Sequence, residues 1–398
     1  MKYPEICSSQ LPNGWKQPIA SRWGHTLHSI CSRTGSFPAN LAHYFISMYS
    51  EPGDRVLDLY SGKGTAPFEA CLMGRVGIGN DACPDAYVLT YAKTRVPQKE
   101  VFLNYLGQVE RRLQKPSISE VDENVKIYFC RDTLRQIVAL QEVANEDSSE
   151  EVRDRDRAKY DNSMFLKALM LGILHGRTEY SLSLPCPHSF AMAPNYVRRK
   201  IRSAPIKYAR PKRDAIKCLK LKTERVFKDP IPAWFKKGEA YQSDAASLEL
   251  NECVDLIITS PPYLRAHTYA WDNWLRLWFL GYDYRKVRPL LIETGSENKY
   301  LDHMEKSLTR MHELLKDNAR CFIVVGDVKG HTPIAYLLAD FIEEKLDIGF
   351  RVRRIIKDDI DRNRKYLYGD NDHTGISTDR ILELCKGTVQ EPRKQVFW

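Results

Sequence analysis

A short apolar run that ends in two consecutive prolines constrains the fold of this chain more than any other feature. Residues 254–263 read Val-Asp-Leu-Ile-Ile-Thr-Ser-Pro-Pro-Tyr, and the apolar part is typical of a buried strand. Pro261 and Pro262 supply no backbone donor and each fixes φ, so the strand must end before them. The sequence therefore predicts a stiff loop that carries the hydroxyl of Ser260 and the ring of Tyr263. In open α/β sheets, ligands bind at this carboxyl edge.

A strand followed by a glycine loop and a helix is predicted near the N-terminus. Residues 56–60, Val-Leu-Asp-Leu-Tyr, indicate a short buried strand, and Ser-Gly-Lys-Gly-Thr follows at 61–65. The glycines permit a tight turn and close backbone approach, and the N-terminus of the next helix is electropositive. A Walker phosphate loop is excluded because Gly-Lys-Ser/Thr does not occur at the required spacing. The unit is typical of the start of a Rossmann-like fold.

Two acids follow predicted strands. Residues 74–81 predict a second strand that ends in Asp81. An acid about twenty residues beyond a glycine loop is placed to accept hydrogen bonds from ribose hydroxyls. A solvent-exposed helix cap is the alternative for Asp81, because Pro84 then begins a helix. Residues 240–244 predict a third strand with Asp244 at its end.

These segments resemble the amino DNA methyltransferases, which methylate exocyclic nitrogens of bases with S-adenosylmethionine. Thr259 to Tyr263 resembles their catalytic signature, and its serine form is most similar to the cytosine-N4 enzymes. Residues 58–65 resemble the family's cofactor loop, with Leu59 in place of Pro and Tyr60 in place of Phe. Residues 32–38 resemble a segment that helps to close the cofactor pocket.

The resemblance implies a class I methyltransferase fold: α/β, with a Rossmann-like mixed sheet of about seven strands and a largely helical, basic insertion. The terminal antiparallel strand pair would be 350–356 and 380–385. S-adenosylmethionine would be the cofactor, with Asp81 on its ribose and Asp244, or less plausibly Asp132, on its adenine amino group. The other cofactor-binding residues implied are Asp58, Tyr60, Ser61, Gly62, Gly64 and Thr65.

The implied catalytic residues are Ser260, Pro261, Pro262 and Tyr263. The Ser260 hydroxyl and the Pro261 carbonyl would accept the two amino hydrogens of the base and free the nitrogen lone pair. Tyr263 would stack on the base, which must be flipped out of the double helix to be reached. Neither a metal nor a covalent intermediate is expected, so Cys186 after Pro185 is not interpreted as a nucleophile.

Residues 101–238 interrupt the expected alternation of strands and helices. Within them, 196–237 hold fifteen Lys/Arg against three Asp/Glu, which favours a polyanionic partner. We therefore divide the chain into 1–100 (arm and cofactor half), 101–238 (helical, basic, candidate DNA-recognition region) and 239–398 (catalytic half). A polar loop is a second candidate for DNA contact through Arg362, Arg364, Lys365, Tyr366 and His373.

Composition narrows the class of protein further. No apolar run approaches the roughly 20 residues of a membrane helix, and the first residues lack the apolar core of a signal peptide. The ten cysteines form no Cys-x-x-Cys pair, which argues against a zinc site or a disulfide framework. The glycine loop lacks the third Gly or Ala that a hydride-transferring Rossmann enzyme needs. A cytoplasmic protein is expected.

The sequence thus predicts a site-specific DNA methyltransferase acting on cytosine N4, with double-stranded DNA and its flipped target base as the partner. A cognate restriction enzyme is a further partner expected by family analogy alone. Three alternatives remain open: DNA adenine-N6 methylation, RNA base methylation, and a non-catalytic DNA-binding module. Trp271, Trp274 and Trp278, at helical spacing, are expected to pack against the sheet first and to shape a base pocket only secondarily.

Overall fold

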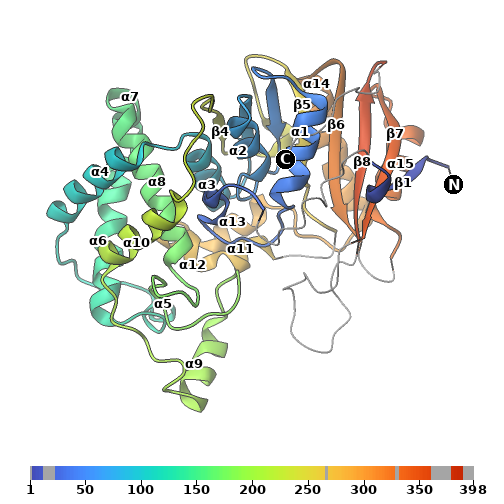
Figure 1. Cartoon of the computed structure of the whole chain (residues 1–398). Helices are drawn as coiled ribbons and strands as arrows, with labels where there is room; N and C mark the ends of the chain where they lie inside the picture. The colour runs from blue at the N-terminus through green and yellow to red at the C-terminus, as the bar shows by residue number, and fades with distance from the viewer. Residues whose placement is uncertain (1, 12–22, 265–267, 328–330, 360–377, 389–398) are drawn as a thin grey trace.

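A single mixed sheet forms the centre of the protein, in a computed structural model that describes residues 2–11, 23–264, 268–327, 331–359 and 378–388. Its eight strands lie in the order β1-β7-β8-β6-β5-β2-β3-β4, and β8 runs antiparallel to both of its neighbours. The strands are β1 Glu5–Cys7, β2 Arg55–Asp58, β3 Val76–Asn80, β4 Glu239–Tyr241, β5 Val254–Thr259, β6 Leu315–Gly326, β7 Phe350–Asp359 and β8 Thr378–Lys386. The predicted α/β mixed sheet with a terminal antiparallel pair is confirmed (Figure 1).

The eighth strand, β1, lies within residues 1–24, whose Pro, Gly and polar residues predict a surface arm. β1 pairs parallel with β7, where Ile6 lies opposite Ile356, and the Ser8 hydroxyl donates to Asp358 at 2.6 Å. The surface-arm prediction is therefore wrong for these residues. A three-residue strand at a sheet edge is too short to leave a periodic pattern in the sequence.

Two layers of helices cover the sheet because successive strand residues point to opposite faces. Leu57, Ile257 and Ile323 pack on one face against α14 and α15. Their chain neighbours Val56 and Ile258 pack on the other face against α1 and α2. These four helices are α1 Ala39–Tyr49, α2 Thr65–Leu72, α14 Glu297–Leu314 and α15 Ile334–Glu344.

A helical lobe stands beside the β4 edge of the sheet, on the left in Figure 1. The lobe packs against α3, Pro84–Thr94. Leu89 and Ala92 of this helix share one buried cluster with Phe102, Phe165 and other lobe residues. The lobe therefore shares a core with the sheet domain. Its helices are α4 Lys99–Arg112, α5 Glu123–Lys126, α6 Arg131–Asp147, α7 Glu150–Arg155, α8 Arg157–Ile173, α9 Pro194–Ser203 and α10 Ala215–Val226.

The three tryptophans pack on this lobe, so the expected packing against the sheet is wrong. The predicted helix is two short ones, α11 Tyr269–Asp272 and α12 Trp274–Phe279. Trp274 meets the ring of Tyr128 edge-on at 5.5 Å between centroids, and Trp278 stacks on Phe129 at 6.5 Å. Helical spacing predicts an apolar face but does not identify the surface that covers it.

The α11–α12 segment continues through α13 Tyr284–Val287 into a loop that reaches back to the sheet. No helix among the described residues is long and apolar enough to cross a membrane. Within the same residues, no group of three or more His, Cys, Asp and Glu side chains is arranged to hold a metal ion.

Candidate active site

The two loops singled out by the sequence lie side by side, at the carboxyl ends of β2 and β5. These strands are parallel neighbours, with Leu57 opposite Ile257. The Thr259 hydroxyl donates to Oδ1 of Asp58 at 2.7 Å, and the backbone N–H of Tyr60 points at both side chains. The start of the glycine loop is thereby joined to the residue before Ser260.

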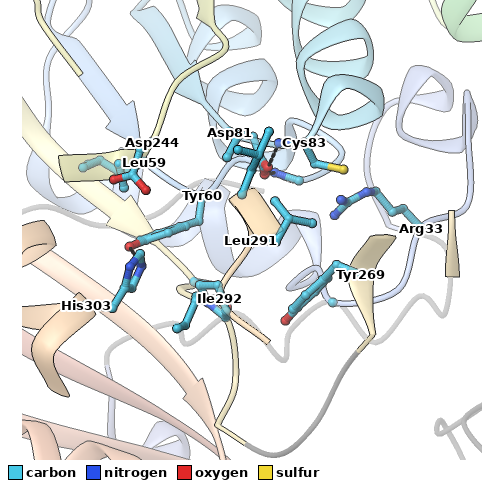
Figure 2. A pocket seen from close by; sticks show the side chains of 17 residues that line it. Arg33, Leu59, Tyr60, Asp81, Cys83, Asp244, Tyr269, Leu291, Ile292 and His303 are labelled. Atoms are coloured by element: carbon cyan, nitrogen blue, oxygen red, sulfur yellow. Dashed lines mark hydrogen bonds between the residues drawn. The ribbon is translucent and has the colours of Figure 1, made fainter. Parts of the chain in front are cut away.

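A cleft of about 580 Å³ opens at this edge (Figure 2). Six of the twelve predicted site residues lie on its wall: Tyr60, Gly62, Asp81, Asp244, Ser260 and Pro262. The other wall residues are Arg33, Gly35, Leu59, Ala82, Cys83, Ala245, Tyr269, Leu290, Leu291, Ile292 and His303. The proline loop, the glycine loop and both strand-end acids therefore face one space.

The side chain of Asp81 fixes the glycine loop beside the cleft through hydrogen bonds to backbone N–H groups. Its Oδ2 accepts the Gly62 N–H at 2.9 Å, and its Oδ1 accepts the Cys83 N–H at 2.9 Å. Gly62 and Gly64 have φ of +53° and +70°, a region that favours glycine. Burial raises the pKa of Asp81, and the nearby Arg33 charge opposes that rise. Asp81 is thus an anchored acid on the wall, not the solvent-exposed cap considered above.

Several predicted cofactor residues turn inward and support the loop from behind. Asp58 is 1% exposed, and burial raises its pKa to about 7. The Ser61 hydroxyl bonds that of Thr90 at 2.9 Å. Gly64 is the N-cap residue of α2 and packs against Thr90. A Cβ on Gly64 would lie 2.8 Å from the Thr90 Cα. Thr65 is buried, and its hydroxyl has no partner among the described residues.

Asp244 and Asp132, the two candidates for binding the adenine amino group, lie in different parts of the structure. Asp244 follows β4, lies exposed on the cleft wall and caps a 3-10 turn by accepting the Ala246 N–H at 2.8 Å. Asp132 lies in the first turn of α6 and pairs with Lys212 at 2.9 Å. It is absent from the cleft wall.

The proline loop presents two of its four residues to the cleft. Ser260 and Pro262 lie on the wall, whereas Pro261 is buried and the partly exposed Tyr263 is not among the wall residues. The Ser260 hydroxyl is 3.4 Å from that of Tyr263. In this arrangement the Tyr263 hydroxyl lies next to that of Ser260, and Tyr263 is not among the residues that line the cleft.

Residues from other segments close the cleft. Arg33 and Gly35 belong to residues 32–38, which were expected near the cofactor, and a Cβ on Gly62 would be 3.4 Å from Nη1 of Arg33. The Arg33 Nε donates to the buried Asp85 at 3.0 Å. Burial works to raise the pKa of Asp85, but the Arg33 charge and the hydrogen bonds from Cys83 and Arg33 together hold that pKa below its usual range.

His303 and the apolar loop after α13 carried no sequence signal. His303 lies on α14, and its Nε2 is 2.7 Å from the Tyr60 hydroxyl. Burial lowers the pKa of His303 although the Asp244 charge opposes this, so the ring is neutral at pH 7. Leu291 and Ile292 face the same space from the other side (Figure 2).

The chemistry of the wall suits a nucleoside attached to a charged amino-acid chain. Asp81 and Asp244 present acceptors, while Leu59, Ala245 and Ile292 are apolar. Gly35 and Gly62 place no side chain on the wall. A Cβ on Gly35 would lie 3.1 Å from the Tyr269 ring. These features fit S-adenosylmethionine, whose ribose and adenine offer hydroxyl and amino donors.

Solved structures match most of the length of this chain, but at low similarity. TrmN from Thermus thermophilus is 12% identical with a TM-score of 0.33; the match covers 90% of this chain but only 52% of that one. An rRNA methylase from Streptococcus thermophilus is 7% identical, with a TM-score of 0.33 and 89% and 100% covered. The rRNA methyltransferase aviRa from Streptomyces viridochromogenes is 9% identical, with a TM-score of 0.32 and 91% of each chain covered. Likeness at this level carries no argument about the site, and none of the curated proteins compared with the chain matches it.

Family membership comes from sequence. The sequence model of the N6/N4 family described as DNA methylase matches residues 9–91 and 254–395. Those segments make up more than half of the 398 residues and contain the glycine loop, Asp81 and the proline loop. The insertion that forms the helical lobe lies between them. The chain therefore belongs to the DNA methylase family, a family of methyltransferases whose methyl donor is S-adenosylmethionine.

Proposed function

We propose that the protein is a site-specific DNA methyltransferase that transfers a methyl group from S-adenosylmethionine to the exocyclic N4 of cytosine. The observation that carries this proposal is the shared cleft: Ser260 and Pro262 face the same space as Gly62 and Asp81. A base amino group at Ser260 and a methyl donor on the glycine loop would then be neighbours. The choice of cytosine N4 rests on the serine that begins the Ser-Pro-Pro-Tyr motif.

The chain's own contribution is to position the base and to accept hydrogen bonds from its amino group. The cytosine amino group is a poor nucleophile because its lone pair is delocalised into the ring. The Ser260 hydroxyl and the Pro261 carbonyl would accept its two hydrogens and draw the nitrogen toward tetrahedral geometry. When bound, S-adenosylmethionine supplies an electrophilic methyl group on sulfur. Holding two reactants in line in this way can supply much of a rate enhancement.

We assign the cofactor roles to residues in and behind the cleft wall. Asp81 would hold the ribose through the carboxylate that also fixes Gly62, and Asp244 would accept from the adenine amino group. Asp58, Ser61, Gly64 and Thr65 would act by shaping the loop. Tyr60 would line the adenosine side, with its hydroxyl held by His303 and Ser307. By analogy with its family, the protein would modify host DNA beside a cognate restriction enzyme.

The identity of the methylated base is the test. Plasmid DNA from cells expressing the protein is digested to nucleosides and analysed by mass spectrometry, with Ser260→Ala as the control. We expect N4-methylcytosine that disappears in the variant. N6-methyladenine in its place would reassign the base within the same family, and methylation confined to RNA would overturn the DNA substrate.

A further inference from the structure

The basic region 196–237 splits in the structure into two parts with different surroundings. The cations of α10 serve the helical lobe itself. Lys222 is 3% exposed and donates to the Ser29 carbonyl at 2.6 Å, and Lys220 pairs with Glu110 at 2.9 Å. The charge excess of this part is therefore partly used in packing and ion pairs.

Residues 190–213, which include α9, contain eight Lys/Arg and not a single Asp or Glu. Within α9, Val197 is buried and anchors the helix. Four cations of α9 and the loop after it are exposed and form no ion pair with the described residues: Arg199, Arg202, Lys207 and Arg210. We call residues 194–210 the basic arm. An uncompensated row of cations of this kind attracts a polyanion.

The basic arm projects from the protein. Figure 1 shows α9 beyond α5 and α12, at the lower end of the lobe. In the loop after α9, Ile206 is 92% exposed, next to Lys207. An apolar side chain among cations fits the DNA major groove, where thymine methyl groups lie between rows of phosphates. A ten-residue helix is about 15 Å long and about 10 Å wide, which this groove admits.

One buried side chain ties the root of the basic arm to the cleft. Arg276 of α12 is 2% exposed. Its Nη2 donates to the Ser189 carbonyl at 2.9 Å and to the Ser32 carbonyl at 2.6 Å. Ser32 precedes Arg33 on the cleft wall, and Ser189 lies five residues before α9. Arg276 therefore joins the segment that precedes the arm to the segment that carries Arg33.

We propose that the basic arm binds the phosphates of duplex DNA and holds the duplex while the target base occupies the cleft. This inference rests on the proposed function for the identity of its partner. Flipping a base costs a few kcal/mol, and contacts between the arm and the flanking duplex would help to offset that cost. Duplex DNA carries a charge every 1.7 Å or so along its axis, which several cations on one short helix and loop can contact together.

The test compares two triple variants of the full chain that remove the same charge from different places. The first is Arg199→Gln, Arg202→Gln and Lys207→Gln in the basic arm. The second is Lys217→Gln, Arg225→Gln and Lys228→Gln, all exposed on or just after α10. Affinity for a short duplex is measured by fluorescence anisotropy over a series of salt concentrations. S-adenosylmethionine affinity, measured by calorimetry, reports whether each variant keeps its cleft.

We expect the basic-arm variant to bind the duplex at least about tenfold more weakly and to lose about two to three units of salt slope. The α10 variant should keep the wild-type affinity and slope, and both should bind the cofactor normally. Equal losses in the two variants, or a loss confined to structured RNA, would overturn the inference. Wild-type duplex binding through the arm without methyl transfer to DNA would instead overturn the proposed function and leave the arm standing.

Discussion

The hydroxyl of Thr259 donates a 2.7 Å hydrogen bond to the buried carboxyl group of Asp58. Thr259 ends β5 and Asp58 ends β2, so this contact sets the proline loop against the glycine loop. The Tyr60 N–H, which lies 3.1 Å from Asp58 Oδ1 and 3.2 Å from Thr259 Oγ1, completes a closed set of polar groups. The spacing of the two loops is thus fixed by three residues at the carboxyl ends of adjacent strands.

Replacing Thr259 by valine should loosen this junction. The shape is conserved, but a buried acceptor loses its donor, so we expect the free energy of unfolding to fall by about 1–3 kcal/mol. Urea denaturation measures it. Thr309→Val is the control, because the Thr309 hydroxyl bonds the Glu305 carbonyl of its own helix. Equal losses in the free energy of unfolding for the two variants would show that the Thr259–Asp58 hydrogen bond stabilises the fold no more than the Thr309 hydrogen bond does.

Asp58 should make stability depend on pH in an unusual direction. Burial raises its pKa from 3.8 to about 7, so between those values the folded state binds more protons than the unfolded state. The contribution of Asp58 to stability is therefore present at low pH and is lost as pH rises toward 7. Asp58→Asn stays neutral and can still accept from Thr259.

The melting temperatures of wild type and Asp58→Asn, measured from pH 5 to pH 8, check this expectation. The melting temperature of the wild type should fall relative to that of the variant as pH rises from 5 to about 7, and the variant should be the more stable at pH 8. A constant difference across the range would mean that Asp58 does not titrate there.

The sequence predicts the central strands and the two loops well because these features are local. Prolines end β5, glycines bend the chain after β2, and Asp81 follows β3, so each leaves a pattern within a few residues. Parallel strands then bring their carboxyl ends to one edge. The topology thus places Ser260 beside Gly62 without any knowledge of side-chain packing.

The remaining parts of the site depend on contacts between distant segments. His303 and Ile292 reach the cleft from a helix and a loop that carry no motif, and Trp274 packs on a lobe whose position no periodicity specifies. Ser61 and Gly64 belong to the predicted loop but face Thr90, because a tight turn points its residues in several directions. The predicted DNA contacts at Arg362, Arg364, Lys365, Tyr366 and His373 lie outside the described residues.

Gly64 should tolerate no side chain. Its φ is +70°, and a Cβ would lie 2.8 Å from the Thr90 backbone. Gly53 has a φ of +97° with nothing within 4 Å, so Gly53→Ala isolates the backbone cost of about 1–2 kcal/mol. We expect Gly64→Ala to lose roughly 1–3 kcal/mol more, together with cofactor affinity. Equal unfolding free energies for the two variants would contradict the close approach.

Asp244 should contribute to cofactor binding where Asp132 does not. The loss of a hydrogen bond to a charged acceptor costs about 1.5–3 kcal/mol, which raises the dissociation constant roughly 10- to 100-fold. Asp244→Asn can still cap its turn, so its fold should be kept. Asp132→Asn is the matched control on α6. Calorimetric titration with S-adenosylmethionine separates the two, and equal affinities would remove Asp244 from the site.

The rate of methyl transfer by Ser260→Ala tests the central claim most directly. Ser260 lies on the cleft wall but outside the glycine loop, so its hydroxyl should act on the base and leave the cofactor alone. Single-turnover transfer to duplex DNA, measured at saturating cofactor, should slow by roughly 100-fold or more. Calorimetry should give an unchanged affinity for S-adenosylmethionine. A variant that transfers methyl groups at the wild-type rate would contradict the account.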